Sequence, residues 1–363
     1  MSIAFFAHDV GEAEIHAMGE AVREGHLTTG VKLREFARAL EARFNFPRVE
    51  LCSSGTSALH LTLFALGIGP GDEVITTPYV GVWTTNTILM VGATPVFADI
   101  DRDSYNLDPA SVAKLVTERT KAVIPVSVNG VPVDYDGLRA VLPDHVRIVC
   151  DDIEALGSTR NGQYVGADMG AGDISVNGFW VSKQVTTCCG GMVTSCDMEF
   201  LDRFEKLTRH GHGLVGDMWD QKFGFNAWMP DPLAAMGIVQ LHRLEEKQER
   251  LLGVKAWLDE WFAPFRKQKL MEGHTATEFV YLIELPEGVD KRGYADRMAR
   301  HGVPTRPYFN SLLDVPHLQP YAEVADCPVT TEVASRTIAL PYHWKLTKAQ
   351  IVDIATAHFK CVR

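Results

Sequence analysis

Two side chains in this sequence could together do chemistry on an amine or a carbonyl compound. Lys183 lies in a Gly- and Thr-rich segment, residues 178–187, and Asp151 ends the apolar run 148–151. A lysine amine can form an imine with an aldehyde, and a carboxylate can keep a ring nitrogen protonated. A pyridoxal 5′-phosphate (PLP) enzyme requires such a pair. Because unrelated Asp and Lys residues occur in every protein, the flanking segments must decide.

The flanking segments add a site for a phosphate group. Residues 49–61 have the pattern of a strand, a small-residue turn at 53–56 and the start of a helix, where free backbone N–H groups and the helix dipole favour an anion. The run 67–75 leads into the next strand, and a turn at 186–192 follows Lys183. Asp152 stands beside Asp151, so the residues alone leave two carboxylates open for the ring nitrogen.

Strands and helices alternate around this pair. The alternation predicts an α/β fold with a mainly parallel sheet covered on both faces. Ligands of such sheets bind at the carboxyl ends of the strands, where Asp151 and the turn at 53–56 both fall. The expected strands are 49–53, 73–77, 94–100, 122–126, 146–151 and 192–195, and the expected helices are 57–66, 83–91, 109–116 and 135–141.

Two domains are expected. Residues 1–235 would form the large PLP-binding α/β domain, and residues 236–363 a linker helix with a smaller α+β C-terminal domain. A single long helix is predicted over 231–262, since its apolar residues share one face. Beyond it we expect a strand over 279–284 and helices over 291–301 and 348–359.

The composition excludes several classes of protein. The 363 residues are 46% hydrophobic and 22% charged, as in an ordinary soluble protein, and the net charge of −11 argues against non-specific nucleic-acid binding. No apolar run reaches the ~18 residues of a membrane span, and no secretory signal is apparent. The seven cysteines lack CxxC spacing, which predicts free thiols, a cytoplasmic protein and no metal site. His210 and His212 are expected in a surface loop.

Further segments carry a family resemblance. They read LTTG at 27–30, GATPVF at 92–97, GFN at 224–226 and ALP at 339–341. With the segments above, they resemble the DegT/DnrJ/EryC1/StrS family of PLP-dependent sugar aminotransferases over nearly the whole chain. TRPYF at 305–309 and HLQP at 317–320 are most similar to the GDP-perosamine synthase branch. The resemblance implies a fold-type-I PLP-dependent transferase.

The resemblance also implies roles for residues at the cofactor. Lys183 would hold PLP as an imine and then move a proton between the α-carbon of the amino-acid donor and C4′ of PLP. Asp151, rather than Asp152, would pair with the ring nitrogen. Glu154 matches a position near the 3-hydroxyl group. Gly55 and Thr56 would contact the phosphate, and Thr56 could also be the N-cap of its helix.

The remaining implied contacts involve phosphate, ring and substrate. Ser182 would bind the phosphate from the same chain and Asn226 from the neighbouring subunit, which implies a homodimer with shared active sites. Trp83 would stack on the ring, although strict register places Val82 there. Substrate contacts fall on His317 and Arg306, and Trp228 would either stack on the substrate or pack at the subunit interface.

The chain departs from the family pattern at several positions. Gly178 replaces a serine whose hydroxyl binds phosphate, Cys188-Cys189 replaces Gly-Glu, and Trp228 replaces an arginine. The expected reaction is transfer of an amino group from L-glutamate to a nucleotide-linked 4-keto-6-deoxyhexose. Because of these departures, two alternatives stay open. One is a PLP enzyme with a non-sugar or otherwise altered substrate, such as an amino-aromatic synthase or another elimination or condensation enzyme; the other is a non-catalytic PLP-binding protein.

Overall fold

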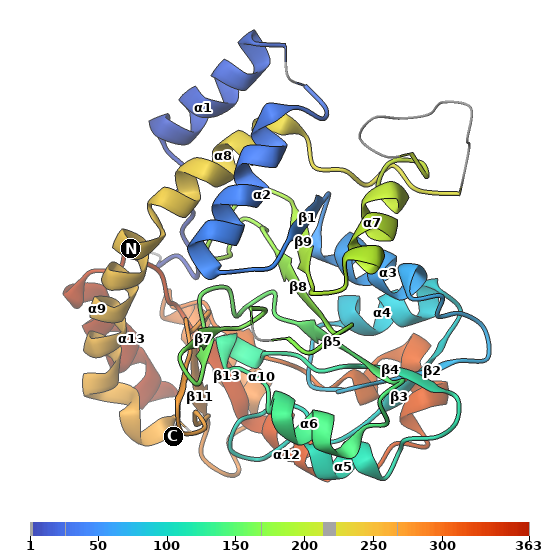
Figure 1. Ribbon diagram of the computed structural model, residues 1–363. Helices are drawn as coiled ribbons and strands as arrows, with labels where there is room; N and C mark the ends of the chain where they lie inside the picture. The colour runs from blue at the N-terminus through green and yellow to red at the C-terminus, as the bar shows by residue number, and fades with distance from the viewer. Residues whose placement is uncertain (1–2, 26, 168, 213–222, 267, 363) are drawn as a thin grey trace.

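A seven-stranded sheet forms the centre of the molecule. The computed structural model describes residues 3–25, 27–167, 169–212, 223–266 and 268–362 (Figure 1). The sheet has the strand order β1-β9-β8-β5-β4-β2-β3, and only β9 runs antiparallel to its neighbours. The expected mainly parallel sheet is confirmed. Its strands are β1 (Val49–Cys52), β2 (Glu73–Thr76), β3 (Thr94–Phe97), β4 (Thr120–Ile124), β5 (Arg147–Asp151), β8 (Ile174–Gly178) and β9 (Gly191–Thr194).

Helices cover both faces of this sheet (Figure 1). Along β5, Val149 packs into the core beneath α3, α4 and α7, whereas Ile148 and Cys150 pack beneath α5 and α6 on the other face. This alternation follows from the two-residue period of a strand. Helices α2 and α8 cover the β1–β9 edge. The helices are α1 (Glu12–Arg23), α2 (Val31–Phe44), α3 (Gly55–Ala65), α4 (Val82–Met90), α5 (Pro109–Ala113), α6 (Tyr135–Val141), α7 (Met198–Leu207) and α8 (Asp231–His242).

Strand β8 was not expected from the sequence, although it lies in the middle of the sheet. It contains Ser175, Asn177 and Gly178, residue types with low strand propensity. Its position between β5 and β9 buries all five residues and overrides that propensity. The strand leads directly into the turn that carries Lys183.

The prediction of one long helix over 231–262 is wrong. Helix α8 ends at His242, and α9 (Leu244–Phe262) begins after Arg243, whose backbone has φ −95° and ψ 1°. The Arg243 guanidinium stabilises the bend between α8 and α9, because it lies 2.8 Å from Glu14 Oε1 and 3.1 Å from Asp9 Oδ1. The N-terminal segment therefore packs at the junction of the two helices.

The C-terminal part of the chain has its own sheet and core. Strands β11 (Tyr281–Glu284), β13 (Thr337–Leu340) and β12 (Arg306–Pro307) form an antiparallel sheet in that order. It packs against α9, α10 (Lys291–Arg300) and α13 (Lys348–Cys361) in a separate apolar cluster. Helix α12 (Pro328–Arg336) precedes β13. A small sheet combines β6 (Thr159–Arg160), β7 (Gln163–Tyr164) and β10 (His274–Thr275). The proposed domain boundary at 235/236 stays a prediction.

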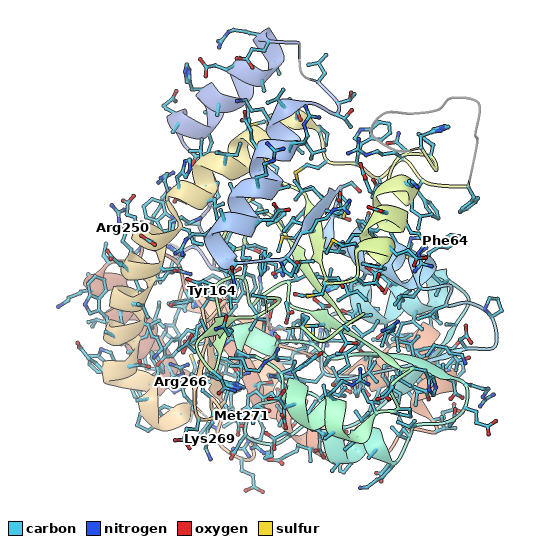
Figure 2. The ribbon with its side chains drawn as sticks, in the orientation of Figure 1. Phe64, Tyr164, Arg250, Arg266, Lys269 and Met271 are labelled. Atoms are coloured by element: carbon cyan, nitrogen blue, oxygen red, sulfur yellow. The ribbon has the colours of Figure 1, made fainter. Side chains whose placement is uncertain are left out.

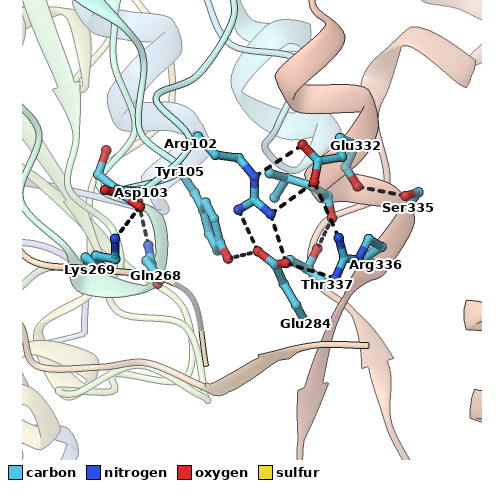
Figure 3. A network of polar contacts seen from close by, with 12 residues as sticks. Arg102, Asp103, Tyr105, Gln268, Lys269, Glu284, Glu332, Ser335, Arg336 and Thr337 are labelled. Carbon is cyan, nitrogen blue, oxygen red and sulfur yellow. Dashed lines mark hydrogen bonds and ion pairs between the residues drawn. The ribbon is translucent and has the colours of Figure 1, made fainter. Parts of the chain in front are cut away.

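A polar network joins the segment after β3 to the C-terminal sheet (Figure 3). The guanidinium of Arg102 donates to both carboxylate oxygens of Glu284, and the hydroxyl of Tyr105 donates to the same carboxylate. Glu332 and Arg336 extend the network at the surface.

Elsewhere, side chains fill the space between sheet and helices (Figure 2), and Phe64 on the outer side of α3 stacks on Phe223 with ring centroids 5.2 Å apart. In the described part of the chain, no helix has both the length and the apolar character to cross a membrane.

Candidate active site

A cavity of about 750 Å³ opens at the carboxyl edge of the central sheet. Its floor comes from residues at or just after the ends of β1, β2, β4, β5 and β8, where parallel sheets bind ligands. Its walls include the N-terminal segment 5–9 and the C-terminal segment 342–344, so the cavity draws on both ends of the chain. The floor residues are Ser54, Val80, Val126, Asp151 and Gly178.

Lys183 lines this cavity from the turn after β8. The turn is held by main-chain hydrogen bonds, among them one of 2.9 Å from Lys183 N–H to the carbonyl of Trp180. The lysine Nζ lies 3.3 Å from Glu154 Oε1 and 3.8 Å from the ring centroid of Phe279. Its side chain is only 10% exposed. The amine is therefore held between a carboxylate and an aromatic face inside the cavity.

Glu154 is itself fixed by two further donors. Its Oε2 accepts a 3.0 Å hydrogen bond from the main-chain N–H of Asn129 and another from the hydroxyl of Tyr308. Burial raises the pKa of Tyr308 well above its ordinary value, and the neighbouring Glu154 carboxylate raises it further. Tyr308 therefore stays protonated and donates. The carboxylate of Glu154 is thus oriented with one oxygen toward Lys183.

Asp151 places a buried carboxylate at the carboxyl end of β5. The residue is 3% exposed, and Thr84 Oγ1 donates to its Oδ2 at 2.7 Å. Burial raises the pKa of Asp151 to about 6, although the Thr84 hydroxyl and the Lys183 ammonium oppose that shift. Asp152 does not line the cavity, and its two oxygens accept hydrogen bonds of 2.6 Å from Ser127 and Ser175. Of the two carboxylates, only Asp151 faces the site.

The N-terminus of α3 lies at the cavity. Ser54, not Thr56, is the N-cap, since its Oγ accepts a 3.0 Å hydrogen bond from Ser57 N–H. Gly55 and Thr56 both line the cavity, and N–H groups in this first helical turn have no partner within the helix. A side chain at Gly55 would lie 2.7 Å from Ile153 Cδ1, so glycine allows the close approach. This end of the helix can bind an anion.

Some of the other residues predicted to contact the cofactor or the substrate line the cavity, and others do not. Ser182, Trp83 and Arg306 line the cavity, and the Arg306 guanidinium lies 4.6 Å from the ring centroid of Phe5. Val82, the residue in strict register for ring stacking, packs into an apolar cluster instead and does not line the cavity.

Three predicted residues lie outside the cavity of this chain. Asn226 forms an isolated β-bridge with Arg209. The ring centroids of Trp228 and His210 lie 5.7 Å apart. His317 Nε2 lies 2.9 Å from Asn86 Oδ1. Their roles at a substrate or in a partner's site stay predictions.

Cysteine and histidine side chains form no metal centre in the described residues. None of the seven cysteines, all of which the structure describes, forms a disulfide. Cys188 is exposed with a left-handed backbone, φ 64°, whereas Cys189 lines the cavity and its Sγ donates to the Ser53 carbonyl at 3.1 Å.

Four residues in the site were missed by sequence reasoning. Thr84 contacts Asp151, and Phe279, Tyr308 and Asn129 surround Lys183 or Glu154. Three of them come from segments far from the Asp–Lys pair in the sequence. Tyr308 lies in the family-like motif at 305–309, but its register there gave no role. Such contacts depend on the tertiary fold, which brings distant segments together, and no local sequence pattern indicates them.

Comparisons with known proteins show the family of this chain. The chain matches the model of the DegT/DnrJ/EryC1/StrS aminotransferase family over residues 8–358. It is 31% identical to the spore coat polysaccharide biosynthesis protein SpsC of Bacillus subtilis (strain 168), over 96% of this chain and 94% of SpsC. It is 32% identical to GDP-perosamine synthase of Caulobacter vibrioides, over 89% of this chain and 88% of that protein.

A solved structure is similar along the whole fold. The PMP form of a candidate sugar aminotransferase, Spr1654 from Streptococcus pneumoniae, superimposes with a TM-score of 0.90 at 28% identity. The match covers 99% of this chain and 98% of that one.

Fold, site and comparisons define an aminotransferase that uses PLP. The chain belongs to the DegT/DnrJ/EryC1/StrS aminotransferase family.

Proposed function

We propose that this enzyme moves an amino group from L-glutamate to the keto group of a sugar, a nucleotide-linked 4-keto-6-deoxyhexose. One observation carries the proposal. The amine of Lys183 and the buried carboxylate of Asp151 face the same cavity at the carboxyl edge of the sheet, beside the N-terminus of α3. These three features correspond to the aldehyde, the ring nitrogen and the phosphate of PLP.

The residues present fit PLP. Asp151 is buried at an energetic cost, which its raised pKa expresses, and a protonated ring nitrogen would supply a positive partner for the carboxylate. Gly55 and Thr56 offer free N–H groups, and Ser182 offers a hydroxyl. Trp83 provides a ring face at the cavity wall. When bound, PLP supplies an electron sink that stabilises negative charge on the carbon next to the transferred nitrogen.

The protein's own residues would then handle the proton. Lys183 Nζ, once unprotonated, takes the proton from the α-carbon of the amino-acid donor and later returns a proton to the sugar carbon. Glu154 keeps that amine oriented, since one of its oxygens lies 3.3 Å from Nζ while Tyr308 and Asn129 hold the other. Asp151 holds the proton on the ring nitrogen throughout.

The walls of the cavity support a sugar substrate carrying an anionic group. Aromatic rings line the walls and can pack against the C–H groups on the face of a sugar ring. These rings belong to Trp83, Trp180, Phe309 and Trp344. Arg306 is exposed, and its guanidinium suits a diphosphate. The 32% identity to GDP-perosamine synthase points in the same direction. An aromatic keto acceptor is the second candidate, because the same ring faces would accommodate it.

A homodimer with shared active sites completes the proposal. Asn226 is exposed and lies outside the cavity of its own chain, as a residue given to a partner's phosphate site would. Trp180 lines the cavity yet is 57% exposed, so one wall presents an apolar surface to a neighbour. Seven cysteines without a disulfide fit a reducing compartment, the cytoplasm.

The test is an absorption spectrum of the purified protein with PLP, before and after L-glutamate is added. We expect the band of the lysine-bound cofactor to disappear and the band of the aminated cofactor to replace it. Lys183→Ala should show neither change. Addition of a nucleoside-diphosphate 4-keto-6-deoxyhexose should then restore the first band.

Three outcomes would contradict parts of the proposal. A wild-type protein without the first band overturns the role of Lys183. A band that ignores L-glutamate overturns the donor. Restoration by an aromatic keto compound but by no keto sugar overturns the acceptor in favour of the second candidate.

A further inference from the structure

The two residues that contact the Lys183 amine, Glu154 and Phe279, both form hydrogen bonds with Asn129. Glu154 and Phe279 approach Nζ at 3.3 Å and 3.8 Å, the latter measured to the ring centroid. Glu154 comes from the turn after β5, and Phe279 comes from the segment that enters β11 of the C-terminal sheet. Nothing in the sequence places these two residues together, so some third element must fix their relative positions.

Asn129 bonds to both of these segments. Its main-chain N–H donates to Glu154 Oε2 at 3.0 Å. Its main-chain carbonyl accepts from Phe279 N–H at 3.4 Å, and its side-chain Oδ1 accepts from Val280 N–H at 2.7 Å. Its Nδ2 donates to Gln268 Oε1 at 3.2 Å. The residue is 1% exposed, so water does not replace these bonds readily.

The backbone of Asn129 restricts which residue can do this. Its φ of 57° and ψ of 26° lie in the left-handed region, which glycine, asparagine and aspartate tolerate best. Glycine would leave Val280 N–H without its acceptor. Aspartate would place a second negative charge near Glu154 and lose the donor to Gln268. Asparagine meets the conformational and the hydrogen-bonding requirement together.

We propose that Asn129 is a positioning residue that sets the Glu154 carboxylate and the Phe279 ring on either side of the Lys183 amine. The inference rests on the role proposed above for Lys183. Asn129 does not line the cavity and would act only through its two neighbours.

The test variant is Asn129→Gly, which keeps the left-handed backbone and the N–H bond to Glu154 but removes the acceptor for Val280. The matched control is Asn161→Gly, since Asn161 also has a left-handed backbone, φ 50°, but is exposed in the turn between β6 and β7. Two rates are measured. In protein freed of PLP, mass spectrometry follows acetylation of Lys183 by acetic anhydride, with exposed Lys114 as reference. Stopped-flow absorbance then follows capture of added PLP.

The two rates should change in opposite directions. Loosening the segment that carries Phe279 frees the amine for a diffusing reagent, so Lys183 acetylation should rise about fivefold relative to Lys114, the factor expected for one lost buried hydrogen bond. Capture of site-bound PLP depends on placement, so its limiting rate should fall about fivefold while the half-saturating PLP concentration stays within about twofold. Asn161→Gly should change neither rate, and Asn129→Asp, which keeps an acceptor, should capture PLP faster than Asn129→Gly.

Equal rates in Asn129→Gly and wild type would overturn the inference. A parallel rise at Lys114 would also overturn it, because general loosening of the fold would then explain the result. Failure of the wild-type protein itself to capture PLP would instead refute the proposed role of Lys183, which separates the two claims.

Discussion

Arg102 and Glu284 form a doubly hydrogen-bonded ion pair between the segment after β3 and strand β11 of the C-terminal sheet, with bonds of 2.7 and 2.9 Å (Figure 3). The Glu284 side chain is 1% exposed, whereas Arg102 is 36% exposed. Burial alone would raise the pKa of Glu284, but hydrogen bonds from Arg102 and Tyr105 outweigh burial and hold it below its ordinary value. The carboxylate is therefore charged in the folded protein at neutral pH and ties the two sheets together.

Replacing this carboxylate should weaken the fold. Glu284→Gln keeps the shape but removes the charge opposite Arg102, and we expect the free energy of unfolding to fall by about 2 kcal/mol at neutral pH, less than for a fully buried pair because Arg102 is partly solvated. Since the folded pKa lies below the unfolded one, the contribution is present above about pH 4.5 and is lost as the pH falls through the folded pKa. Urea unfolding across this pH range measures it.

Glu332→Gln is the matched control. Glu332 contacts the same Arg102 guanidinium at 3.1 Å, but its side chain is 49% exposed. An exposed partner contributes little, so a change below about 0.5 kcal/mol is expected. Equal losses for the two variants would show that burial of Glu284 has no special weight.

Asp151→Asn should have opposite effects on stability and on cofactor binding. Burial raises the pKa of Asp151 from 3.8 to about 6, so in the protein without PLP the carboxylate that forms above this range costs folding free energy. Stability of the wild type therefore falls as the pH rises from about 3.8 to 6, and the asparagine variant avoids this loss. We expect the variant without PLP to be more stable by up to about 3 kcal/mol near neutral pH and equally stable below pH 3.8.

The same substitution should impair the enzyme once PLP is added. Asparagine cannot hold the ring nitrogen protonated as a carboxylate does, so kcat should fall by about 10²-fold or more. Thermal unfolding without PLP and turnover with PLP are the two measurements. A variant that is less stable than wild type at neutral pH without PLP would contradict the assignment of Asp151 as a carboxylate buried at a cost.

Gly55→Ala should weaken PLP binding through crowding. The added methyl group would lie 2.7 Å from Ile153 Cδ1 and 3.4 Å from the Cα of Gly178, so the Ile153 side chain or the start of α3 must shift inside the cavity. Because that helix end offers its N–H groups to the phosphate, we expect the dissociation constant for PLP to rise about tenfold, measured by titration of the absorbance change.

Gly253→Ala provides the control for this change. Gly253 lies within α9, where an added methyl group meets nothing within 4 Å. It should leave PLP affinity unchanged and stabilise the protein by about 0.5–1 kcal/mol, since alanine is the better helix former. Unchanged affinity in both variants would mean that the N-terminus of α3 does not hold the phosphate.

The shared active site can be tested by mixing subunits. Lys183→Ala and Asn226→Ala should each be nearly inactive as homodimers. In a mixed dimer, one site combines the wild-type Lys183 of one chain with the wild-type Asn226 of the other. Random mixing by co-expression should therefore restore about a quarter of wild-type activity. No recovery, with mixed dimers demonstrated by affinity tags, would place Asn226 outside the partner's site.

The sequence predicted the elements that carry the site better than the contacts within it. Strand β5 and helix α3 were expected because each has an apolar pattern of its own, and Asp151 and Gly55 fall at their ends. Strand β8 was missed because Asn177 and Gly178 have low strand propensity. Only its position inside the sheet makes it a strand. The break at Arg243 was missed because apolar periodicity continues through it, while the acidic partners that stabilise the bend come from the N-terminus.

The surroundings of Lys183 could not be predicted for a similar reason. Phe279 and Tyr308 reach the site from the C-terminal sheet, and no local spacing connects them to Asp151. Resemblance supplied the roles of Lys183 and Asp151. The choice of Trp83 over Val82 as the residue lining the cavity required the orientation of α4.

The walls of the cavity include residues 5–9 and residues 342–344, near opposite ends of the chain. During synthesis on the ribosome, the first of these segments emerges long before the second. The central sheet can form while the C-terminal segment is still in the exit tunnel, but the pocket then lacks a wall. Newly made protein should therefore remain unable to retain its cofactor until residues 342–344 have left the ribosome, and ribosome-bound chains that stop before residue 342 should stay empty.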